Sequence, residues 1–168
     1  MITVRLPWPQ IQTILLDMDG TLLDLRFDNH FWRELVPVRY AERHGLPLEQ
    51  ARIEVAARTR RVEGTLDWYC LDYWSRELEL DVVALKYEIE HLIAVHPHVR
   101  DFLAALRASG RRVALVTNAH GHSLTMKMEK TGLAGYFDTL VCAHDLGLAK
   151  EQAAFWPRLR ALEPFDPA

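Results

Sequence analysis

The sequence predicts an α/β fold in which helices flank a parallel sheet and a helical segment is inserted into the chain. Two apolar stretches rich in branched side chains, within residues 13–23 and 112–118, are typical of buried parallel strands. Between them, residues 24–95 carry apolar side chains at helical spacing and interrupt the strand–helix–strand order. We therefore expect an α/β core formed by residues 1–23 and 96–168, with residues 24–95 as a helical insertion.

Composition limits the classes of protein to which the chain can belong. A chain of 168 residues can bury a core and suits one domain with an insertion. Its formal charge of −3, with scattered Lys and Arg, indicates neither a polymeric nucleic acid nor an anionic membrane as partner. Cys70 and Cys142 lack metal-type spacing and are expected to be reduced thiols of a cytoplasmic protein. Residues 1–12 lack the apolar segment of a signal peptide, and no apolar run is long enough to span a bilayer.

The first predicted strand ends in two aspartates. Because side chains alternate along a strand, Asp17 and Asp19 point to one side and Met18 to the other. Two carboxylates in one pocket repel each other, and Mg²⁺ would let both stay ionised, so we expect both to be metal ligands. Asp17 is then placed to act as a nucleophile, and Asp19 as a general acid and base. Gly20 permits a sharp turn in which Thr21 and backbone amides would bind a phosphate, with an ordinary aspartate-rich turn as the alternative.

Four helices are predicted within the insertion. Their apolar spacing and boundary residues place them at residues 27–44, 47–57, 65–78 and 81–93. An aromatic cluster in the third helix either stacks on a substrate base or fills the core of the insertion; it consists of Trp68, Tyr69, Tyr73 and Trp74. Three arginines after the second helix either meet an anionic substrate or lie on a solvated face; they are Arg58, Arg60 and Arg61.

The chain then returns to the α/β core. Its pattern predicts a helix, a strand, a helix and a strand, at residues 99–109, 112–118, 122–131 and 136–142. Because the carboxyl ends of parallel strands meet at one edge, Thr117 and Asn118 should lie near Asp17, where they would bind a phosphate. Lys150, at the start of a helix that begins near Glu151, would screen the carboxylates and the phosphoryl group.

The stretch from Asp17 to Leu22, Asp-Met-Asp-Gly-Thr-Leu, resembles the first motif of the haloacid dehalogenase (HAD) superfamily in its phosphatase form. The resemblance implies a HAD-like Rossmannoid sheet, with Asp17 as the nucleophile that forms an aspartyl-phosphate and Asp19 as the general acid and base. Thr117 is similar to the phosphate-binding residue of the second motif, and Lys150 to the lysine of the third. The helical insertion resembles the C1 cap, which usually supplies substrate contacts in this superfamily.

Two features depart from the pattern of the superfamily. Ala149 stands before Lys150 where the family commonly has proline, which predicts a looser loop. The fourth motif, a strand ending in an acidic pair that completes the Mg²⁺ site, is missing, because Asp166 follows no apolar strand. Since that strand would pair with the strand before Asp17, its absence would expose a sheet edge and remove a metal ligand. We therefore expect a truncated core in a shortened or partial chain, which would hydrolyse poorly and self-associate through that edge.

Several segments are similar to those of bacterial nucleotidases that dephosphorylate GMP and IMP. They comprise residues 15–25, 27–29, 31–32, 35–37, 68–75 and 117–120. The resemblance implies a Mg²⁺-dependent purine 5′-nucleotidase whose partner is a purine nucleoside monophosphate. Two alternatives remain open: a sugar-phosphate phosphatase or mutase of the same superfamily, and a catalytically silent binding or assembly protein.

Overall fold

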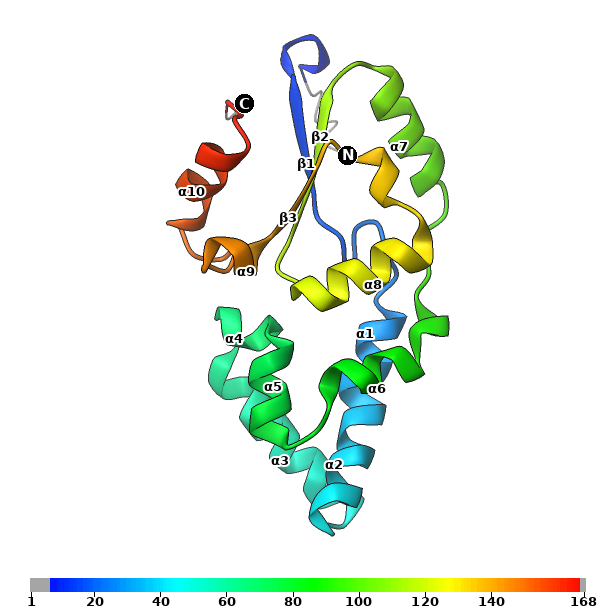
Figure 1. Ribbon diagram of the computed structural model, residues 1–168, viewed down its shortest axis with the longest axis vertical. Helices are drawn as coiled ribbons and strands as arrows, with labels where there is room; N and C mark the ends of the chain where they lie inside the picture. Colours follow the sequence, from blue (N-terminus) through cyan, green and yellow to red (C-terminus); the bar gives the residue numbers. More distant parts are fainter. Residues whose placement is uncertain (1–6, 167–168) are drawn as a thin grey trace, which may run out of the picture.

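The computed structural model describes residues 7–166. Residues 1–6 and 167–168, which we expect to belong to the α/β core, lie outside the described residues, as does half of the segment 1–12 that we expect not to be a signal peptide. Figure 1 shows a sheet flanked by helices above and a bundle of helices below. The strands are β1 (Thr13–Leu16), β2 (Arg112–Thr117) and β3 (Thr139–Cys142). The flanking helices are α7 (Val99–Ala108), α8 (Gly121–Thr131), α9 (Ala143–Leu146) and α10 (Phe155–Leu162), with short turns η1 (Trp8–Gln10) and η4 (Ala134–Tyr136).

The sheet is parallel, with the strand order β1-β2-β3 and with Leu16 opposite Leu115. Side chains of β2 alternate between two apolar clusters, because Val113 and Leu115 face one side and Ala114 and Val116 the other. Helices α7 and α8 cover the first side, and α9 and α10 the second (Figure 1). This double coverage explains the apolar run of β2 and confirms the α/β fold class.

Strand β1 differs from the buried strand that its sequence predicts. All four of its residues are only half-buried, because among residues 7–166 the strand pairs on one side only, with β2. The expected sheet edge is therefore present in the described part of the chain, whereas self-association through it stays a prediction.

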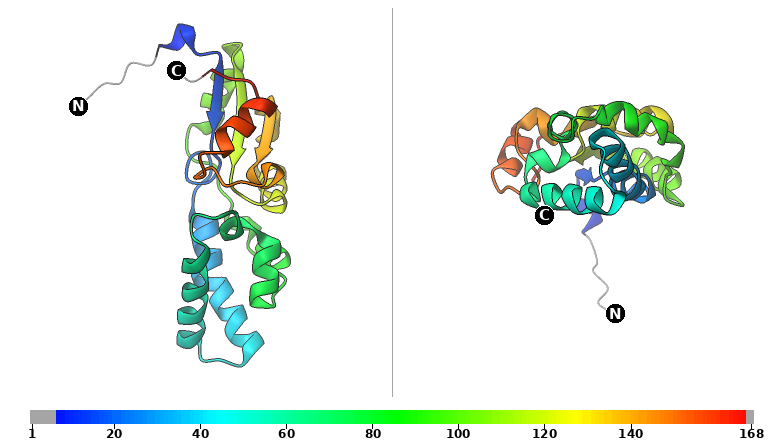
Figure 2. Two further views of the ribbon diagram at one scale, coloured as in Figure 1. Left: turned by 90° about the vertical axis from the view of Figure 1, so that its left-hand side faces the viewer. Right: turned by 90° about the horizontal axis from the view of Figure 1, so that it is seen from below.

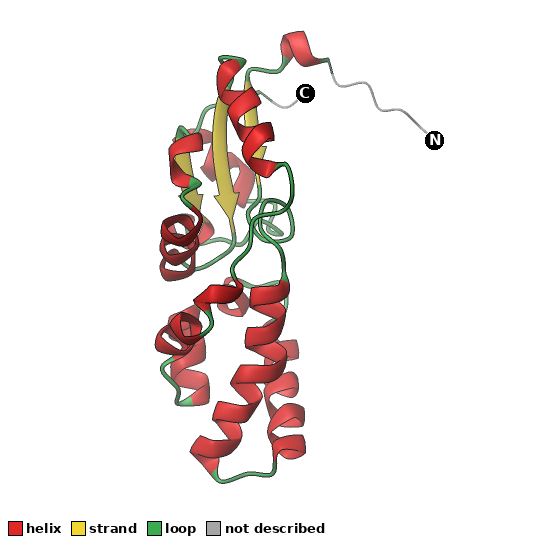
Figure 3. Cartoon of the chain, turned by 90° about the vertical axis from the view of Figure 1, so that its right-hand side faces the viewer, coloured by secondary structure: helices red, strands yellow, loops and turns green. Residues whose placement is uncertain are grey.

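The helical bundle, residues 26–92, has an apolar core of its own. Its elements are α1 (Arg26–His30), η2 (Phe31–Leu35), α2 (Val36–His44), α3 (Leu48–Val62), α4 (Leu66–Tyr69), α5 (Leu71–Leu78), α6 (Val82–Glu88) and η3 (Glu90–Leu92). Phe27, Phe31 and Trp74 are at most 1 % exposed and lie at its centre. Figures 2 and 3 show this bundle as a separate layer of helices at the carboxyl ends of the strands.

Two of the expected helices are interrupted. The stretch predicted as one helix over 27–44 contains a π-helical turn, η2, followed by Pro37, which has no N–H to donate to the carbonyl of Arg33. The stretch predicted as one helix over 65–78 breaks at Cys70, whose backbone is extended. The Cys70 Sγ accepts a hydrogen bond of 3.4 Å from the amide of Tyr73 and so caps α5.

The chain passes twice between the sheet and the bundle, and the two passages lie side by side. Leu23 and Val95 form an antiparallel bridge, and the amide of Asp24 donates to the carbonyl of Ala94 at 2.9 Å. A second bond of 3.0 Å joins the amide of His96 to the carbonyl of Leu22. These hydrogen bonds fix the position at which the chain passes between the sheet and the bundle. Within residues 7–166, no helix has both the length and the apolar character needed to cross a bilayer.

Candidate active site

The carboxyl end of β1 directs two carboxylates into one cavity. Met18 is fully buried in the core of the sheet, whereas Asp17 and Asp19, on either side of it, line a cavity of about 370 Å³. This is the alternation that the sequence predicts. A cavity of this volume is at the lower end of the range for small-molecule sites. It lies between the strand ends and the helical bundle, both of which contribute to its lining.

Lys150 is the cation nearest to Asp17. Its Nζ lies 2.6 Å from Asp17 Oδ1 and 3.0 Å from the carbonyl oxygen of Val116. Lys150 lies in a turn and not at a helix start, because α10 begins only at Phe155. The predicted helix start near Glu151 is therefore wrong, but the lysine still points into the site.

The turn that carries Lys150 is held by specific hydrogen bonds. The amide of Ala149, which a proline would lack, donates to the side-chain oxygen of Gln152 at 3.0 Å. The amide of Lys150 donates to Asn118 Oδ1 at 2.9 Å. Ala149 is fully buried, and the expectation of a looser loop at this alanine stays a prediction.

Thr117 and Asn118 lie beside the carboxylates, as the strand order predicts. Both are buried and line the cavity. The Thr117 hydroxyl accepts a hydrogen bond of 3.0 Å from the amide of Ala119, which leaves its own proton for another acceptor. The Asn118 amide nitrogen donates to both oxygens of Glu151, at 3.1 and 2.9 Å.

Gly20 and Thr21 are not brought to the cavity. Both are exposed and neither is among its lining residues. Gly20 has a φ of +77°, which an L-residue rarely adopts, and its amide donates to the carbonyl of Leu23 at 2.8 Å. The glycine therefore turns the chain as expected, whereas phosphate binding by Gly20 and Thr21 stays a prediction.

The aromatic residues of the bundle divide between the cavity and the core. Trp32, Trp68 and Tyr69 line the cavity, whereas Trp74 is 1 % exposed and packs edge-on against Trp32 and Tyr73. The three arginines of the bundle lie elsewhere. Arg58 pairs with Glu77 at 2.8 Å, and Arg60 and Arg61 are exposed.

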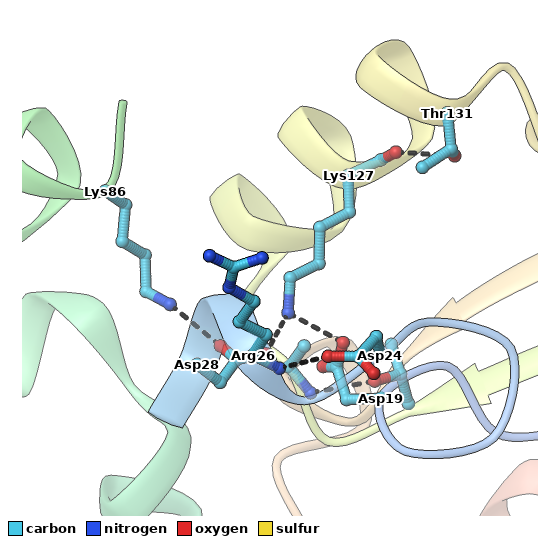
Figure 4. A network of polar contacts seen from close by, with 9 residues as sticks. Asp19, Asp24, Arg26, Asp28, Lys86, Lys127 and Thr131 are labelled. Atoms are coloured by element: carbon cyan, nitrogen blue, oxygen red, sulfur yellow. Dashed lines mark hydrogen bonds and ion pairs between the residues drawn. The ribbon is translucent and has the colours of Figure 1, made fainter. Parts of the chain in front are cut away.

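A second lysine, Lys127 of α8, contacts the other carboxylate. Its Nζ lies 2.6 Å from Asp19 Oδ1 and 2.6 Å from Asp28 Oδ2, and Lys86 lies 3.2 Å from Asp28 Oδ1 (Figure 4). Burial raises the pKa of Asp19 above its ordinary value, against the opposing effect of Lys127. Burial also acts to raise the pKa of Asp28, but the two lysines outweigh it and the pKa is lowered.

Four further residues line the cavity that were not among the predicted site residues: Asp28, Lys86, Lys127 and Glu151. A signal for the lysines exists in the sequence. Lys127 lies four residues before Thr131 on the buried side of α8, and Lys86 follows Val82 and Leu85 on the buried side of α6. A lysine within the apolar stripe of a helix indicates a buried charge that has a partner.

The carboxylates fit a magnesium ion only in part. Mg²⁺ is commonly held by one or two carboxylates together with substrate phosphate and water, and Asp17 and Asp19 would supply those two carboxylates. Among residues 7–166, no group of three or more His, Cys, Asp or Glu side chains could hold a metal ion. The donor set therefore suits a metal shared with a bound phosphate better than a site formed by protein groups alone.

Comparison with known proteins gives consistent matches. Residues 11–160 match the family of haloacid dehalogenase-like hydrolases. The chain is 42 % identical over 153 residues to the GMP/IMP nucleotidase YrfG of Escherichia coli, a match that covers 91 % of this chain and 69 % of that one. It is 31 % identical over 176 residues to a phosphoglycolate phosphatase of Nitrosospira multiformis, covering 97 % of this chain and 73 % of that one.

Solved structures show the same fold. A HAD phosphatase of Thermococcus onnurineus superposes with a TM-score of 0.76 at 22 % identity, over 89 % of this chain and 72 % of that one. The HAD-hydrolase YfnB of Bacillus subtilis, solved bound to magnesium, superposes with a TM-score of 0.62 at 19 % identity, over 94 % of this chain and 76 % of that one. At these identities the likeness supports the fold alone.

Proposed function

Because this chain belongs to the haloacid dehalogenase-like hydrolase family, we propose that it is a phosphomonoester hydrolase acting on a purine 5′-nucleotide through an aspartyl-phosphate. One observation carries the proposal: Asp17 and Asp19 share a cavity, and Lys150 lies 2.6 Å from Asp17. A nucleophile, an acid–base group and a cation for the phosphoryl oxygens are the parts that phosphoryl transfer to a carboxylate needs.

In the first step, an oxygen of Asp17 attacks phosphorus and forms a new P–O bond. The ester bond to the leaving ribose oxygen breaks, and Asp19 gives its proton to that oxygen. Lys150 and Thr117 hold the phosphoryl oxygens through an ammonium and a hydroxyl, and Asn118 holds the turn of Lys150 through its bonds to Glu151 and to the amide of Lys150.

In the second step, water hydrolyses the aspartyl-phosphate. Asp19, now a carboxylate, takes a proton from the water while the water oxygen bonds to phosphorus. The bond between phosphorus and the Asp17 oxygen breaks, so that phosphate leaves and the carboxylate is restored. Mg²⁺, which we propose is held by Asp17 and Asp19, would supply positive charge for the phosphoryl group when bound.

The nucleotide assignment has two supports. The nucleotidase YrfG, whose name specifies GMP and IMP, is 42 % identical to this chain. Trp32, Trp68 and Tyr69 give the cavity an aromatic wall on the side of the helical bundle, and such rings stack on nucleobases. A phosphate at the carboxylates would then leave the base next to these rings.

The test is phosphate release from GMP, IMP, a sugar phosphate and 2-phosphoglycolate, with Mg²⁺ and with EDTA. We expect Mg²⁺-dependent release that is fastest with GMP or IMP. Asp17→Asn should abolish it, because the amide cannot form the aspartyl-phosphate. Asp101→Asn, an exposed position on α7, is the matched control and should retain wild-type turnover.

Each result discriminates between the functions. Retained turnover in Asp17→Asn would exclude Asp17 as the nucleophile. Faster phosphate release from a sugar phosphate or 2-phosphoglycolate than from GMP and IMP would show that the chain is another phosphatase of the family and not a nucleotidase. Tight GMP binding without phosphate release would favour the silent binding protein.

A further inference from the structure

We propose that Lys127 is a positioning residue that orients the acid–base carboxylate of Asp19, and that Asp28 and Lys86 hold Lys127 in place. The inference rests on the proposed function, in which Asp19 protonates the leaving group. It concerns a cation that does not contact Asp17 and that the two-step mechanism above does not use.

The burial of Lys127 is the first observation. Its side chain is only 2 % exposed, and its Nζ reaches Asp19 Oδ1 and Asp28 Oδ2 at the same distance of 2.6 Å (Figure 4). A lysine taken out of water is costly unless it is paired and hydrogen-bonded. Here the carboxylates of Asp19 and Asp28 compensate the charge, each with one oxygen 2.6 Å from the Nζ. Short bonds in a buried site restrict the carboxylate of Asp19 to one orientation.

Asp28 is the second element of the network. It lies in α1, the first helix of the bundle, and its two oxygens bind different lysines. Lys86 of α6 lies 3.2 Å from one oxygen, and Lys127 of α8 lies 2.6 Å from the other. Asp28 is therefore held from the bundle and from the α/β core at once.

Lys86 is buried like Lys127. Its side chain is 3 % exposed, and its Nζ lies over the rings of Phe27 and Phe31, at 4.8 and 4.5 Å from their centroids. Cation–π contacts of this kind strengthen when they are shielded from water. The order Lys86, Asp28, Lys127, Asp19 thus links the interior of the bundle to the carboxylate at the end of β1 (Figure 4).

Each carboxylate of the site has its own lysine. Lys150 binds Asp17 Oδ1, and Lys127 binds Asp19 Oδ1, both at 2.6 Å. Lys150 is placed to contact a phosphoryl group on Asp17. Lys127 acts on the reaction through Asp19, so its loss should impair the protonation of the leaving group more than the attack on phosphorus.

The leaving group provides the test. Ribose oxygen needs a proton to leave, whereas p-nitrophenolate is stable without one. We expect Lys127→Met to lower kcat/KM, which reports the first step, by about 10²-fold or more for GMP and by less than about tenfold for p-nitrophenyl phosphate. The second step is common to both esters and is not compared in this ratio. The matched control is Lys130→Met, which removes a half-exposed lysine from the same helix and should change neither rate.

A second variant and a structural readout address a possible folding defect. Asp28→Asn keeps the shape of the side chain but weakens its hold on both lysines. It should also lose more activity with GMP than with p-nitrophenyl phosphate, and the difference should be smaller than in Lys127→Met. A crystal structure of Lys127→Met should show Asp19 in a changed or multiple orientation. An unchanged Asp19 there, or an equal loss of kcat/KM with both esters in Lys127→Met and Asp28→Asn, would overturn the inference. Failure of the wild-type chain to hydrolyse either ester would instead refute the proposed function, and the inference with it.

Discussion

The hydroxyl of Tyr69 donates a hydrogen bond of 2.6 Å to Glu151 Oε1 and so joins the helical bundle to the turn that carries Lys150. Glu151 also accepts from Asn118, whose side-chain oxygen in turn accepts from the amide of Lys150. Burial and the bond to Glu151 raise the pKa of Tyr69 to about 12. The phenol therefore remains a donor throughout the physiological pH range, and the contact is maintained.

Tyr69→Phe should weaken this contact without disturbing the ring. We expect a loss of about 1 kcal/mol in the free energy of unfolding, below the usual value for a bond to a charged group because the pair is partly exposed. A raised pKa stabilises the protonated phenol, so this contribution is complete below the unfolded pKa near 10 and is lost only as the pH rises through about 12. Urea unfolding at pH 7 and pH 9 should give the same difference from wild type.

The control for this prediction is Tyr87→Phe, at a position that is 47 % exposed on α6. It should leave the free energy of unfolding unchanged. A difference between wild type and Tyr69→Phe that disappears between pH 7 and pH 9 would mean that the phenol ionises in that range and that the contact is not as described.

Trp32→Ala tests the aromatic wall. Stacking of a base on an aromatic side chain is worth about 1–3 kcal/mol, so we expect KM for GMP to rise by about 5- to 150-fold. Inorganic phosphate, the product, has no ring to stack, so its inhibition constant should be unchanged. Trp156→Ala, an exposed position on α10, is the control. If Trp32→Ala weakened the binding of GMP and the binding of phosphate equally, the substitution would have distorted the cavity as a whole.

Lys150→Met tests the cation beside Asp17. Removal of one preorganised donor to a transition-state charge usually costs about 10²- to 10³-fold in kcat, and we expect a loss of that size with GMP. Unlike Lys127→Met, this variant should lose as much activity with p-nitrophenyl phosphate, because the phosphoryl group is the same in both esters. Steady-state kinetics with the two substrates distinguishes the lysines, and an unchanged kcat would exclude Lys150 from the site.

The sequence was sufficient to predict that Asp17 and Thr117 meet at the strand ends. Asp17 and Thr117 follow neighbouring parallel strands, whose carboxyl ends share one edge, so their proximity follows from topology alone. Lys150 lies in the cavity as expected, although the expectation rested on the resemblance to the third motif and on a helix start near Glu151 that the structure does not have. The roles of these residues in catalysis are still predictions.

Features that depend on tertiary contacts were not predictable in the same way. Lys127 and Lys86 are long charged side chains, which are rarely buried, and only the three-dimensional approach of Asp28 shows why they are. The break at Cys70 was also missed, because the apolar spacing of α4 and α5 continues through it and only the packing of the bundle separates them. Half-burial of β1 depends on its neighbours in the sheet and not on its composition.

Glu163→Gln tests a buried carboxylate at the opposite end of the sheet. Glu163 is 1 % exposed and accepts hydrogen bonds from Arg112 at 2.8 Å and from the Thr139 hydroxyl at 2.7 Å, which ties the residue after α10 to β2 and β3. The bond from Arg112, with that from Thr139, lowers the pKa of Glu163. A lowered pKa contributes stability above the unfolded pKa, and this contribution is lost as the pH falls through the folded pKa.

We therefore expect Glu163→Gln to lower the free energy of unfolding at pH 7 by about 1.5–3 kcal/mol, the range for hydrogen bonds to charged groups. The deficit should shrink as the pH falls below the unfolded pKa near 4.3, because wild type then loses the same charge. Urea unfolding at pH 7 and at a series of pH values below 4.3 measures both effects. Glu49→Gln, whose carboxylate is 80 % exposed and pairs with Arg52, should change stability little at any of these pH values. A deficit that stays constant at pH values well below 4.3 would show that Glu163 acts through its shape and not through its charge.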